Sequence, residues 1–216
     1  MNGINKVAIL LCTRGLIFGQ TVKTLFNNLS GITYEPFSPV IGLPIPEAQN
    51  EAVRMALTTP ANLFLSIEED IEIPEGTLKR MIEMDKDIVA VDYPVDTGHG
   101  TVQRKNGEII FCGLGCTLIK RKVFEAVGEP WFDISKSLKI TSMDPYEYEV
   151  WDVPYKYGGL DVLFCHKARE LGFKIHQLPG VEAKHLRVIK NDDRRYNQGA
   201  QEIKALPPIS KHINYH

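Results

Sequence analysis

The most informative part of the chain reads Leu63-Phe64-Leu65-Ser66-Ile67-Glu68-Glu69-Asp70-Ile71-Glu72-Ile73-Pro74. Its first five residues form a mainly apolar run, which is typical of a strand buried on both faces. Four acids follow within five residues, and a proline then marks the start of a helix that we expect to reach about Met84. The stretch therefore predicts a buried strand that carries a cluster of carboxylates at its carboxyl end.

Apolar runs and helical spacings alternate on both sides of this stretch. We expect strands at residues 7–12, 87–92, 115–120 and 173–178, and helices at 19–29, 47–57, 121–127 and 161–171. This alternation predicts an α/β fold with a mostly parallel central sheet and helices on both faces. The dipeptide Asn106-Gly107, between extended runs at 101–104 and 108–111, adds a small antiparallel hairpin.

The length of 216 residues fits a single domain. We place this domain at residues 1–187 and treat residues 188–216 as a polar C-terminal tail, which is either extended or a lid over the site. Residues 132–158 show no clear period and are expected to be irregular. The aromatic side chains in and next to this segment either form a stacking surface for a ligand or cover a loop core. They are Trp131, Tyr146, Tyr148, Trp151 and Tyr155.

The composition is that of a globular protein with an ordinary surface, because 44% of the residues are hydrophobic and 24% are charged. The 25 basic and 27 acidic residues nearly balance, so the charge gives no signature of nucleic-acid binding. The apolar run at 7–12 is too short to span a membrane and lacks a signal-peptide cleavage site. We therefore expect no transmembrane segment and a cytoplasmic protein whose four cysteines are reduced.

The acids after the strand suggest a cation site. Glu68 and Asp70 are two residues apart, so in an extended backbone they project to the same side. Ligands of open α/β sheets bind beyond the carboxyl ends of the strands. Two carboxylates directed at one point there suit Mg²⁺ or Mn²⁺ together with a diphosphate. The alternative is a solvated acidic turn before a helix N-terminus, which favours negative charge.

Further blocks along the chain give this cluster a context. They lie in order at residues 48–57, 87–94, 113–132 and 159–175, and Lys184-His185-Leu186 follows them. Together with residues 63–74 they resemble glycosyltransferases of the GT-A type, in particular the family 2-like enzymes. Glu68-Glu69-Asp70 stands in the place of that family's Asp-x-Asp motif. The resemblance extends over about residues 5–187 and implies a single GT-A-like (Rossmann-like) domain.

The resemblance implies a metal-dependent hexosyltransferase that moves a sugar from a nucleoside-diphosphate sugar, with UDP favoured, to an unknown acceptor hydroxyl. It implies Mn²⁺ or Mg²⁺ bound by Asp70 and His185 with help from Glu68, and an imidazole ligand favours Mn²⁺. It also implies Asp161 as the base that deprotonates the acceptor. A helix N-terminus is expected to lower the pKa of Asp161 and keep it ionised. His185 could instead be an ordinary surface histidine, and Asp161 an ordinary first-turn aspartate.

The same resemblance places nucleotide contacts at the ends of the first strands and on the second helix. The residues implied are Thr13, Arg14, Asn50, Glu68 and Glu69. Arg14 would act as a charge-assisted phosphate donor, or it is simply solvated. Asn50 would bind the base or the ribose, or it is exposed on its helix.

Two departures from the family pattern leave other functions open. Glu68 replaces the first aspartate of the motif, and Leu160 stands before Asp161 where the family often has a second acid. A non-catalytic protein that binds nucleotide sugars or carbohydrate is one alternative. A nucleotidyltransferase similar to the sugar-nucleotide pyrophosphorylases is another, although Cys12-Thr13-Arg14-Gly15 is only a weak match to their phosphate loop.

Overall fold

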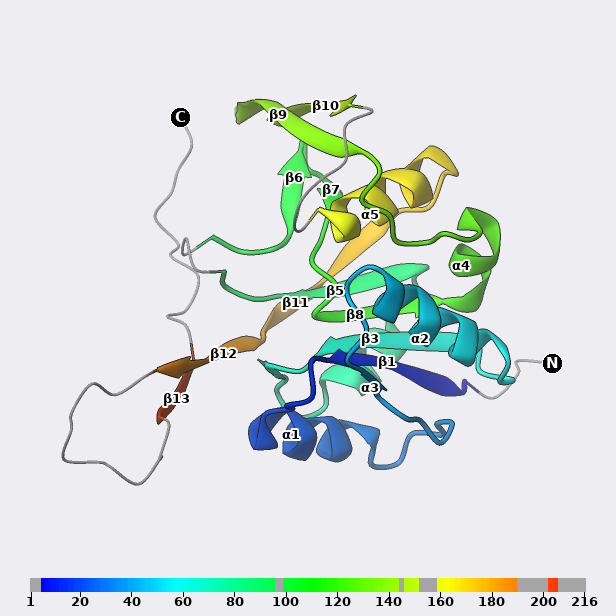
Figure 1. The fold of residues 1–216 in the computed structure, drawn as a ribbon, viewed down its shortest axis with the longest axis vertical. Helices are drawn as coiled ribbons and strands as arrows, with labels where there is room; N and C mark the ends of the chain where they lie inside the picture. Colours follow the sequence, from blue (N-terminus) through cyan, green and yellow to red (C-terminus); the bar gives the residue numbers. More distant parts are fainter. Residues whose placement is uncertain (1–4, 96–98, 144–145, 152–158, 190–201, 206–216) are drawn as a thin grey trace.

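The computed structural model describes residues 5–95, 99–143, 146–151, 159–189 and 202–205. Its centre is an eight-stranded sheet with the order β2-β1-β3-β8-β5-β11-β7-β6 (Figure 1). The strands of this sheet are β1 (Val7–Thr13), β2 (Val40–Ile41), β3 (Leu63–Glu68), β5 (Ile88–Asp92), β6 (Gln103–Lys105), β7 (Glu108–Phe111), β8 (Cys116–Lys120) and β11 (Ile175–Glu182).

Six of the eight strands point in one direction. β1 is parallel to β2 and β3, and β5 is parallel to β11. β8 lies antiparallel between β3 and β5, and β7 lies antiparallel between β11 and β6. The predicted mostly parallel sheet is therefore confirmed by strand direction. The carboxyl ends of β1, β3 and β5 lie at one edge of the sheet.

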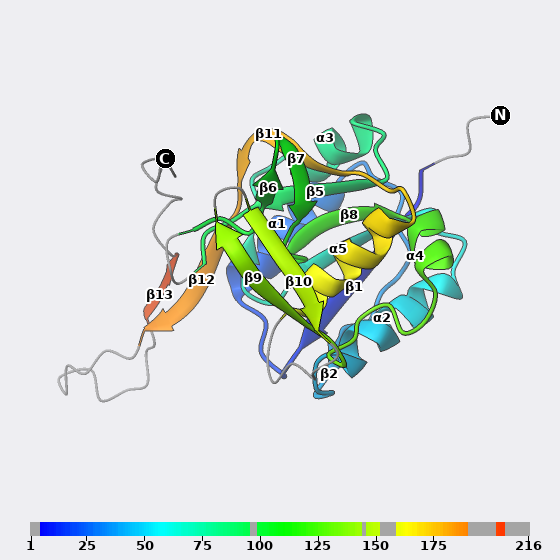
Figure 2. The same ribbon diagram turned by 90° about the horizontal axis from the view of Figure 1, so that it is seen from above.

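Five helices cover the two faces of the sheet, as the alternating pattern predicted. They are α1 (Gly19–Leu29), α2 (Glu47–Leu57), α3 (Thr77–Glu83), α4 (Arg121–Val127) and α5 (Leu160–Glu170). Figures 1 and 2 show α1 and α3 on one side of the sheet and α2, α4 and α5 on the other. The molecule is thus a three-layer sandwich.

Alternate residues of each central strand enter opposite cores. In β1, Ala8 and Leu10 pack toward α2, α4 and α5, whereas Val7 and Ile9 pack toward α1 and α3. All four side chains are buried. This explains why the strands are continuous apolar runs, because a strand covered on both faces leaves no side chain in water.

One aromatic cluster dominates the core beneath α2, α4 and α5. Phe124 of α4 stacks on Phe64 and Phe164 with ring centroids 5.4 and 5.3 Å apart. Trp131 and Phe132 meet its edge, each at 6.4 Å. Trp131 is 5% exposed and donates its indole N–H to the carbonyl oxygen of Phe124. It is therefore a core residue and does not form a sugar platform.

The predicted hairpin is present as β6 and β7, and its turn residues have the positive φ angles of a type I′ turn, 51° at Asn106 and 81° at Gly107. Glycine supplies such a φ angle without a steric cost. The hairpin adds two strands to the edge of the central sheet. Sequence patterning thus located both the turn and the strands that it joins.

Several strands were not expected from the sequence. Within the segment predicted to be irregular, β9 (Ser137–Met143) and β10 (Tyr146–Trp151) form an antiparallel pair. Figure 2 shows this pair lying across α5. A further small sheet has the order β13-β12-β4 and consists of β4 (Ile71–Glu72), β12 (Lys184–Ile189) and β13 (Glu202–Ala205). β4 has only two residues, and its pairing with the distant β12 defines it.

We predict that Phe124→Ala lowers the free energy of unfolding by about 3–5 kcal/mol, because the substitution removes a fully buried ring that contacts four other aromatic side chains. Urea denaturation followed by circular dichroism measures the change. Phe26→Ala on α1 is the control, since the Phe26 side chain is 52% exposed and should cost well under half as much. Equal losses in the two variants would contradict this assignment of the core.

Candidate active site

The acidic cluster lies where β3 leaves the sheet. Glu68 is the last residue of β3, Glu69 and Asp70 form the turn that follows, and β4 begins at Ile71. The side chains of this turn separate into two groups. Glu69 is directed toward the end of β1, whereas Glu68 and Asp70 lie close enough for the charge of Asp70 to raise the pKa of Glu68.

Strand pairing brings distant residues to Asp70. β12 pairs antiparallel with β4, with His185 opposite Ile71, and the N–H of Leu186 donates to the carbonyl oxygen of Asp70 at 2.8 Å. His185 and Arg187, two residues apart on β12, therefore reach the Asp70 carboxylate. His185 Nε2 lies 3.3 Å from Asp70 Oδ2, and Arg187 Nη1 donates to the same oxygen at 2.9 Å.

His185 is held in one orientation. Its Nδ1 lies 3.0 Å from the carbonyl oxygen of Pro94, which can only accept, so Nδ1 carries a proton and Nε2 faces Asp70. The ring is 6% exposed and meets the edge of Tyr93. Burial lowers the pKa of His185, but the hydrogen bond to Asp70 and its charge outweigh burial, so the pKa is raised. His185 is therefore a positioned member of the cluster and not a surface histidine.

Glu68 lies in a confined space beside the start of β8. Its N–H donates to the carbonyl oxygen of Gly115, and a Cβ at Gly115 would lie only 2.9 Å from Glu68 Oε2 and 2.6 Å from the Tyr93 hydroxyl. Burial, followed by the charges of Asp70 and Asp161, raises the pKa of Glu68 to about 7. Glycine at position 115 leaves room for both side chains.

Asp161 is the second residue of α5, and Gly159 occupies the N-cap position. Its charge raises the pKa values of Glu68 and Tyr93, which places it beside the same cluster. The expectation that the helix N-terminus lowers the pKa of Asp161 is wrong. Burial raises the pKa by more than the hydrogen bonds from the N–H groups of Val162 and Asp161 itself lower it.

Three residues predicted to contact the nucleotide are bonded to one another at the end of β1. Glu69 accepts from the hydroxyl of Thr13 at 2.5 Å, from the backbone N–H of Arg14, and from the Arg14 guanidinium at 2.7 and 3.0 Å. Glu69 is mostly buried, while the side chain of Arg14 is 84% exposed. Glu69 thus anchors the loop that presents Arg14 at the carboxyl edge of the sheet.

Asn50 is not part of either group. It is 6% exposed on α2, and both ends of its amide are bonded to the backbone of Phe132, at 2.8 Å to the carbonyl oxygen and 3.0 Å from the N–H. Asn50 thus lies neither exposed on its helix nor beside the acidic cluster. These two hydrogen bonds tie α2 to the segment that follows α4.

Sequence reasoning missed the contacts of Arg187 and Tyr93 with the cluster. Arg187 is the last residue of the expected domain, and its spacing of two residues from His185 would place both side chains on one side of a strand. Tyr93 follows β5, and its buried hydroxyl accepts from the N–H of Gly115 at 2.9 Å. Only the tertiary structure shows either contact.

The structure decides the exposure of two of the aromatic residues predicted to bind an acceptor. Trp131 is in the core, whereas Trp151 at the end of β10 is 41% exposed. Tyr146 and Tyr148 belong to β10, and Tyr155 lies outside the described residues. The exposure of Trp151 suits stacking on a sugar.

Within the described ranges, no three His, Cys, Asp or Glu side chains are grouped so that they could hold a metal ion among themselves. Asp70 and His185 nevertheless fit as a pair, since an oxygen and a correctly oriented ring nitrogen face each other at 3.3 Å. Mg²⁺ and similar ions commonly take only one or two protein carboxylates and complete their shell with water and substrate phosphates. The residues present therefore fit a cation that is shared with a diphosphate.

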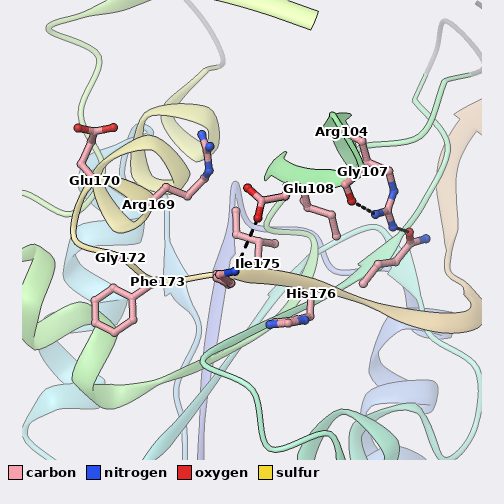
Figure 3. A pocket seen from close by; sticks show the side chains of 12 residues that line it. Arg104, Gly107, Glu108, Arg169, Glu170, Gly172, Phe173, Ile175 and His176 are labelled. Carbon is pink, nitrogen blue, oxygen red and sulfur yellow. Dashed lines mark hydrogen bonds and ion pairs between the residues drawn. The ribbon is translucent and has the colours of Figure 1, made fainter. Parts of the chain in front are cut away.

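A cavity of about 540 Å³ lies away from this cluster, at the start of β11 (Figure 3). The end of α5 and the β6–β7 hairpin line it. Two of the basic side chains that line it have partners, since Arg104 donates to Gln177 at 2.7 Å and Lys174 lies 3.6 Å from Glu108. Ile175, which lines the cavity, is the first residue of β11, whereas Asp70 and His185 lie near the opposite end of that strand. The cavity is therefore separate from the candidate site.

The raised pKa of Glu68 predicts a pH-dependent stability in the metal-free protein. Between pH 4.5, its ordinary pKa, and about pH 7, the folded state binds more protons at Glu68 than the unfolded state does. The free energy of unfolding should therefore fall as the pH rises through this range, by about 3 kcal/mol at most. Denaturation in EDTA at a series of pH values measures this loss.

Glu68→Gln should remove most of that pH dependence, because glutamine stays neutral. The Glu68→Gln protein should consequently be more stable than the parent at pH 8. Glu83→Gln is the matched control, since Glu83 is exposed on α3. If the free energy of unfolding of the parent protein stays constant from pH 4.5 to about 7, Glu68 is not a buried, uncompensated charge.

Within the part of the chain that the structure describes, every helix is too short or too polar to cross a bilayer. No family model matches the chain, and no curated protein matches its sequence. Solved structures do match it in fold. A197 from STIV superposes with a TM-score of 0.59 at 19% identity, covering 84% of this chain and 85% of that one.

Two glycosyltransferase structures also match. The catalytic domain of Drosophila beta1,4galactosyltransferase 7, in complex with xylobiose, has a TM-score of 0.53 at 14% identity and covers 94% of this chain and 77% of that one. GalNAc-T7 with UDP, GalNAc and Mn²⁺ has a TM-score of 0.53 at 10% identity, covering 85% of this chain. The match spans only 44% of the GalNAc-T7 chain. These likenesses establish a GT-A-like fold for this protein.

Proposed function

We propose that this protein is a glycosyltransferase that moves a hexosyl group from a nucleoside-diphosphate sugar, with UDP favoured, to an acceptor hydroxyl. The observation that carries the proposal is the convergence of Glu68, Asp70, Asp161 and His185 at the carboxyl edge of a GT-A-like sheet. These residues come from three separate parts of the chain. Clefts at this edge are where open α/β sheets bind their ligands.

Asp70 and His185 are the proposed protein ligands of a divalent cation, with Glu68 assisting. The imidazole favours Mn²⁺ over Mg²⁺, and the fixed Nδ1–H of His185 directs Nε2 toward the ion. The cation would neutralise charge on the departing diphosphate. Binding a cation requires an ionised Glu68, so it would reverse the rise in pKa that burial causes. GalNAc-T7, a match in fold, was crystallised with Mn²⁺ and UDP, which supports Mn²⁺ as the proposed cation and UDP as the proposed nucleotide.

Asp161 is the proposed base that takes the proton from the acceptor hydroxyl. A raised pKa makes its carboxylate a stronger base than a solvated aspartate. Its position at the start of α5, beside Glu68, leaves the acceptor to approach from the side of the β9–β10 pair. Trp151 at the end of β10 is the candidate stacking surface for an acceptor sugar.

The group of Thr13, Arg14 and Glu69 is the proposed nucleotide contact. Arg14 presents its guanidinium to solvent at the carboxyl edge while Glu69 holds its position. A phosphate can compete for the N–H groups of Arg14, because guanidinium binds phosphate and carboxylate in the same forked geometry. A cytoplasmic location and the use of the C-terminal residues 188–216 as a lid remain parts of the proposal.

The metal assignment predicts that Asp70→Ala lowers kcat/KM for Mn²⁺-dependent hydrolysis of UDP-sugars by at least about 100-fold, since the variant loses a charged ligand. Release of UDP from several UDP-sugars measures the rate. Glu83→Gln should retain the parent rate because it removes an exposed charge on α3. Equal turnover by Asp70→Ala and the parent protein would count decisively against the proposed site.

The base assignment predicts that Asp161→Asn lowers kcat by about 10²–10⁴-fold and leaves the affinity for UDP unchanged. Calorimetry with UDP and Mn²⁺, followed by a turnover assay, measures both quantities. Normal turnover in Asp161→Asn would remove this residue from the mechanism. Tight binding of UDP by the parent protein without any turnover would instead identify a non-catalytic nucleotide-sugar-binding protein.

A further inference from the structure

Arg187 lies within the acidic cluster but has no role in the function proposed so far. Its guanidinium donates to Asp70 Oδ2 at 2.9 Å, and its side chain is 37% exposed while that of Asp70 is 12% exposed. Its charge also opposes the rise in the pKa values of Glu68 and His185. One guanidinium therefore acts on all three side chains that are proposed to surround a divalent cation.

Arg187 and a cation at Asp70 would compete for the negative charge of the Asp70 carboxylate. Asp70 Oδ2 already faces both His185 Nε2 and Arg187 Nη1, at 3.3 and 2.9 Å. A divalent ion shared by Asp70 and His185 would place two more positive charges next to the guanidinium. Like charges at such separations repel strongly in a partly buried site. Binding of the cation therefore favours movement of Arg187 away from Asp70.

A diphosphate offers Arg187 an alternative partner. Arg187 and His185 are two residues apart on β12, so their side chains leave the same side of the strand. A diphosphate that contacts a cation at His185 is thus within reach of Arg187. Guanidinium binds phosphate in a forked geometry with charge-assisted hydrogen bonds, and the partial exposure of Arg187 leaves room to turn.

We propose that Arg187 is a diphosphate-binding residue that Asp70 holds in the absence of ligands, and that it exchanges Asp70 for the donor's diphosphate when cation and nucleotide bind. This inference rests on the proposed function of the site. It makes the binding of cation and of nucleotide cooperative beyond their direct contact, because each ligand favours the same displacement of Arg187. Such coupling is reciprocal.

Titration of the protein with Mn²⁺ alone, with UDP alone in EDTA, and with Mn²⁺ at saturating UDP tests the exchange. Arg187→Met should bind Mn²⁺ alone about 5- to 10-fold more tightly than the parent, because Asp70 is no longer neutralised. It should bind UDP about 10-fold more weakly, and the gain in Mn²⁺ affinity caused by UDP should shrink by a similar factor. The difference in affinity between the parent and Arg187→Met should be smaller for UMP, which has one phosphate, than for UDP.

Two further variants separate this role from a structural one. Lys184→Met removes the same charge from the same strand, but Lys184 pairs with Glu72 at 2.7 Å, so this variant should match the parent in all titrations. Arg187→Lys retains a positive charge without the fork and should give intermediate values. If Arg187→Met and Arg187→Lys lose thermal stability but keep the parent's Mn²⁺ and UDP affinities, the residue is a structural ion pair and the inference is overturned.

The outcomes also separate this inference from the function on which it rests. If the parent binds Mn²⁺ and UDP, Asp70→Ala loses Mn²⁺, and Arg187→Met equals the parent, only the role of Arg187 fails. If the parent binds neither ligand, the site and the exchange fail together. The inference is supported only when Arg187→Met changes the two affinities in opposite directions.

Discussion

The backbone pairing of β12 with the turn that follows β3 holds the candidate site together. The N–H of Leu186 donates to the carbonyl oxygen of Asp70, and His185 and Arg187 on either side of Leu186 then reach the Asp70 carboxylate. These residues are more than a hundred positions apart in sequence. Without this pairing, Asp70 would belong to a solvated acidic turn, because no other described side chain donates to its carboxylate in the hydrogen bonds of this structure.

The site concentrates negative charge that the protein only partly compensates. Burial raises the pKa values of both Glu68 and Asp161, and the charges of Asp70 and Asp161 add to the effect on Glu68. His185 and Arg187 offset it from the β12 side. Perturbed carboxylates of this kind are common at functional sites, because chemistry requires charges that stability alone would remove. A cation and a diphosphate would complete the balance in a way that no described side chain does.

Of the other residues predicted to bind the nucleotide, Asn50 and Glu69 hold backbone segments in place, and Arg14 extends toward solvent. Asn50 joins α2 to the backbone of Phe132, next to the aromatic cluster around Phe124. Glu69 anchors the loop after β1 and holds Arg14 at the carboxyl edge. Gly115 leaves space for Glu68 and Tyr93. The core and the site are therefore connected, since the elements that bury the aromatic rings also set the positions of the carboxylates.

The local pattern of apolar residues was sufficient to predict the helices and strands that form the two cores. The periodicity predicted α1, α2 and α4 with the bounds that the structure shows, and the apolar runs predicted β1, β3, β5 and β8, because burial on both faces leaves a continuous hydrophobic signal. The carboxylates after β3 were also visible, since their position follows directly from the end of a strand. The structure alone assigned β8 its antiparallel place between β3 and β5.

Tertiary contacts decided the features that have no local signal. β4 and β12 are defined by their pairing with each other, and β4 has only two residues, so no period in the sequence could reveal it. The pKa of Asp161 depended in the same way on burial by distant segments, which outweighed the effect of its own helix. A hydrophobic period records which face of an element is buried, but the partner of a backbone N–H or of a carboxylate is recorded only by the folded chain, because that partner comes from a distant part of the sequence.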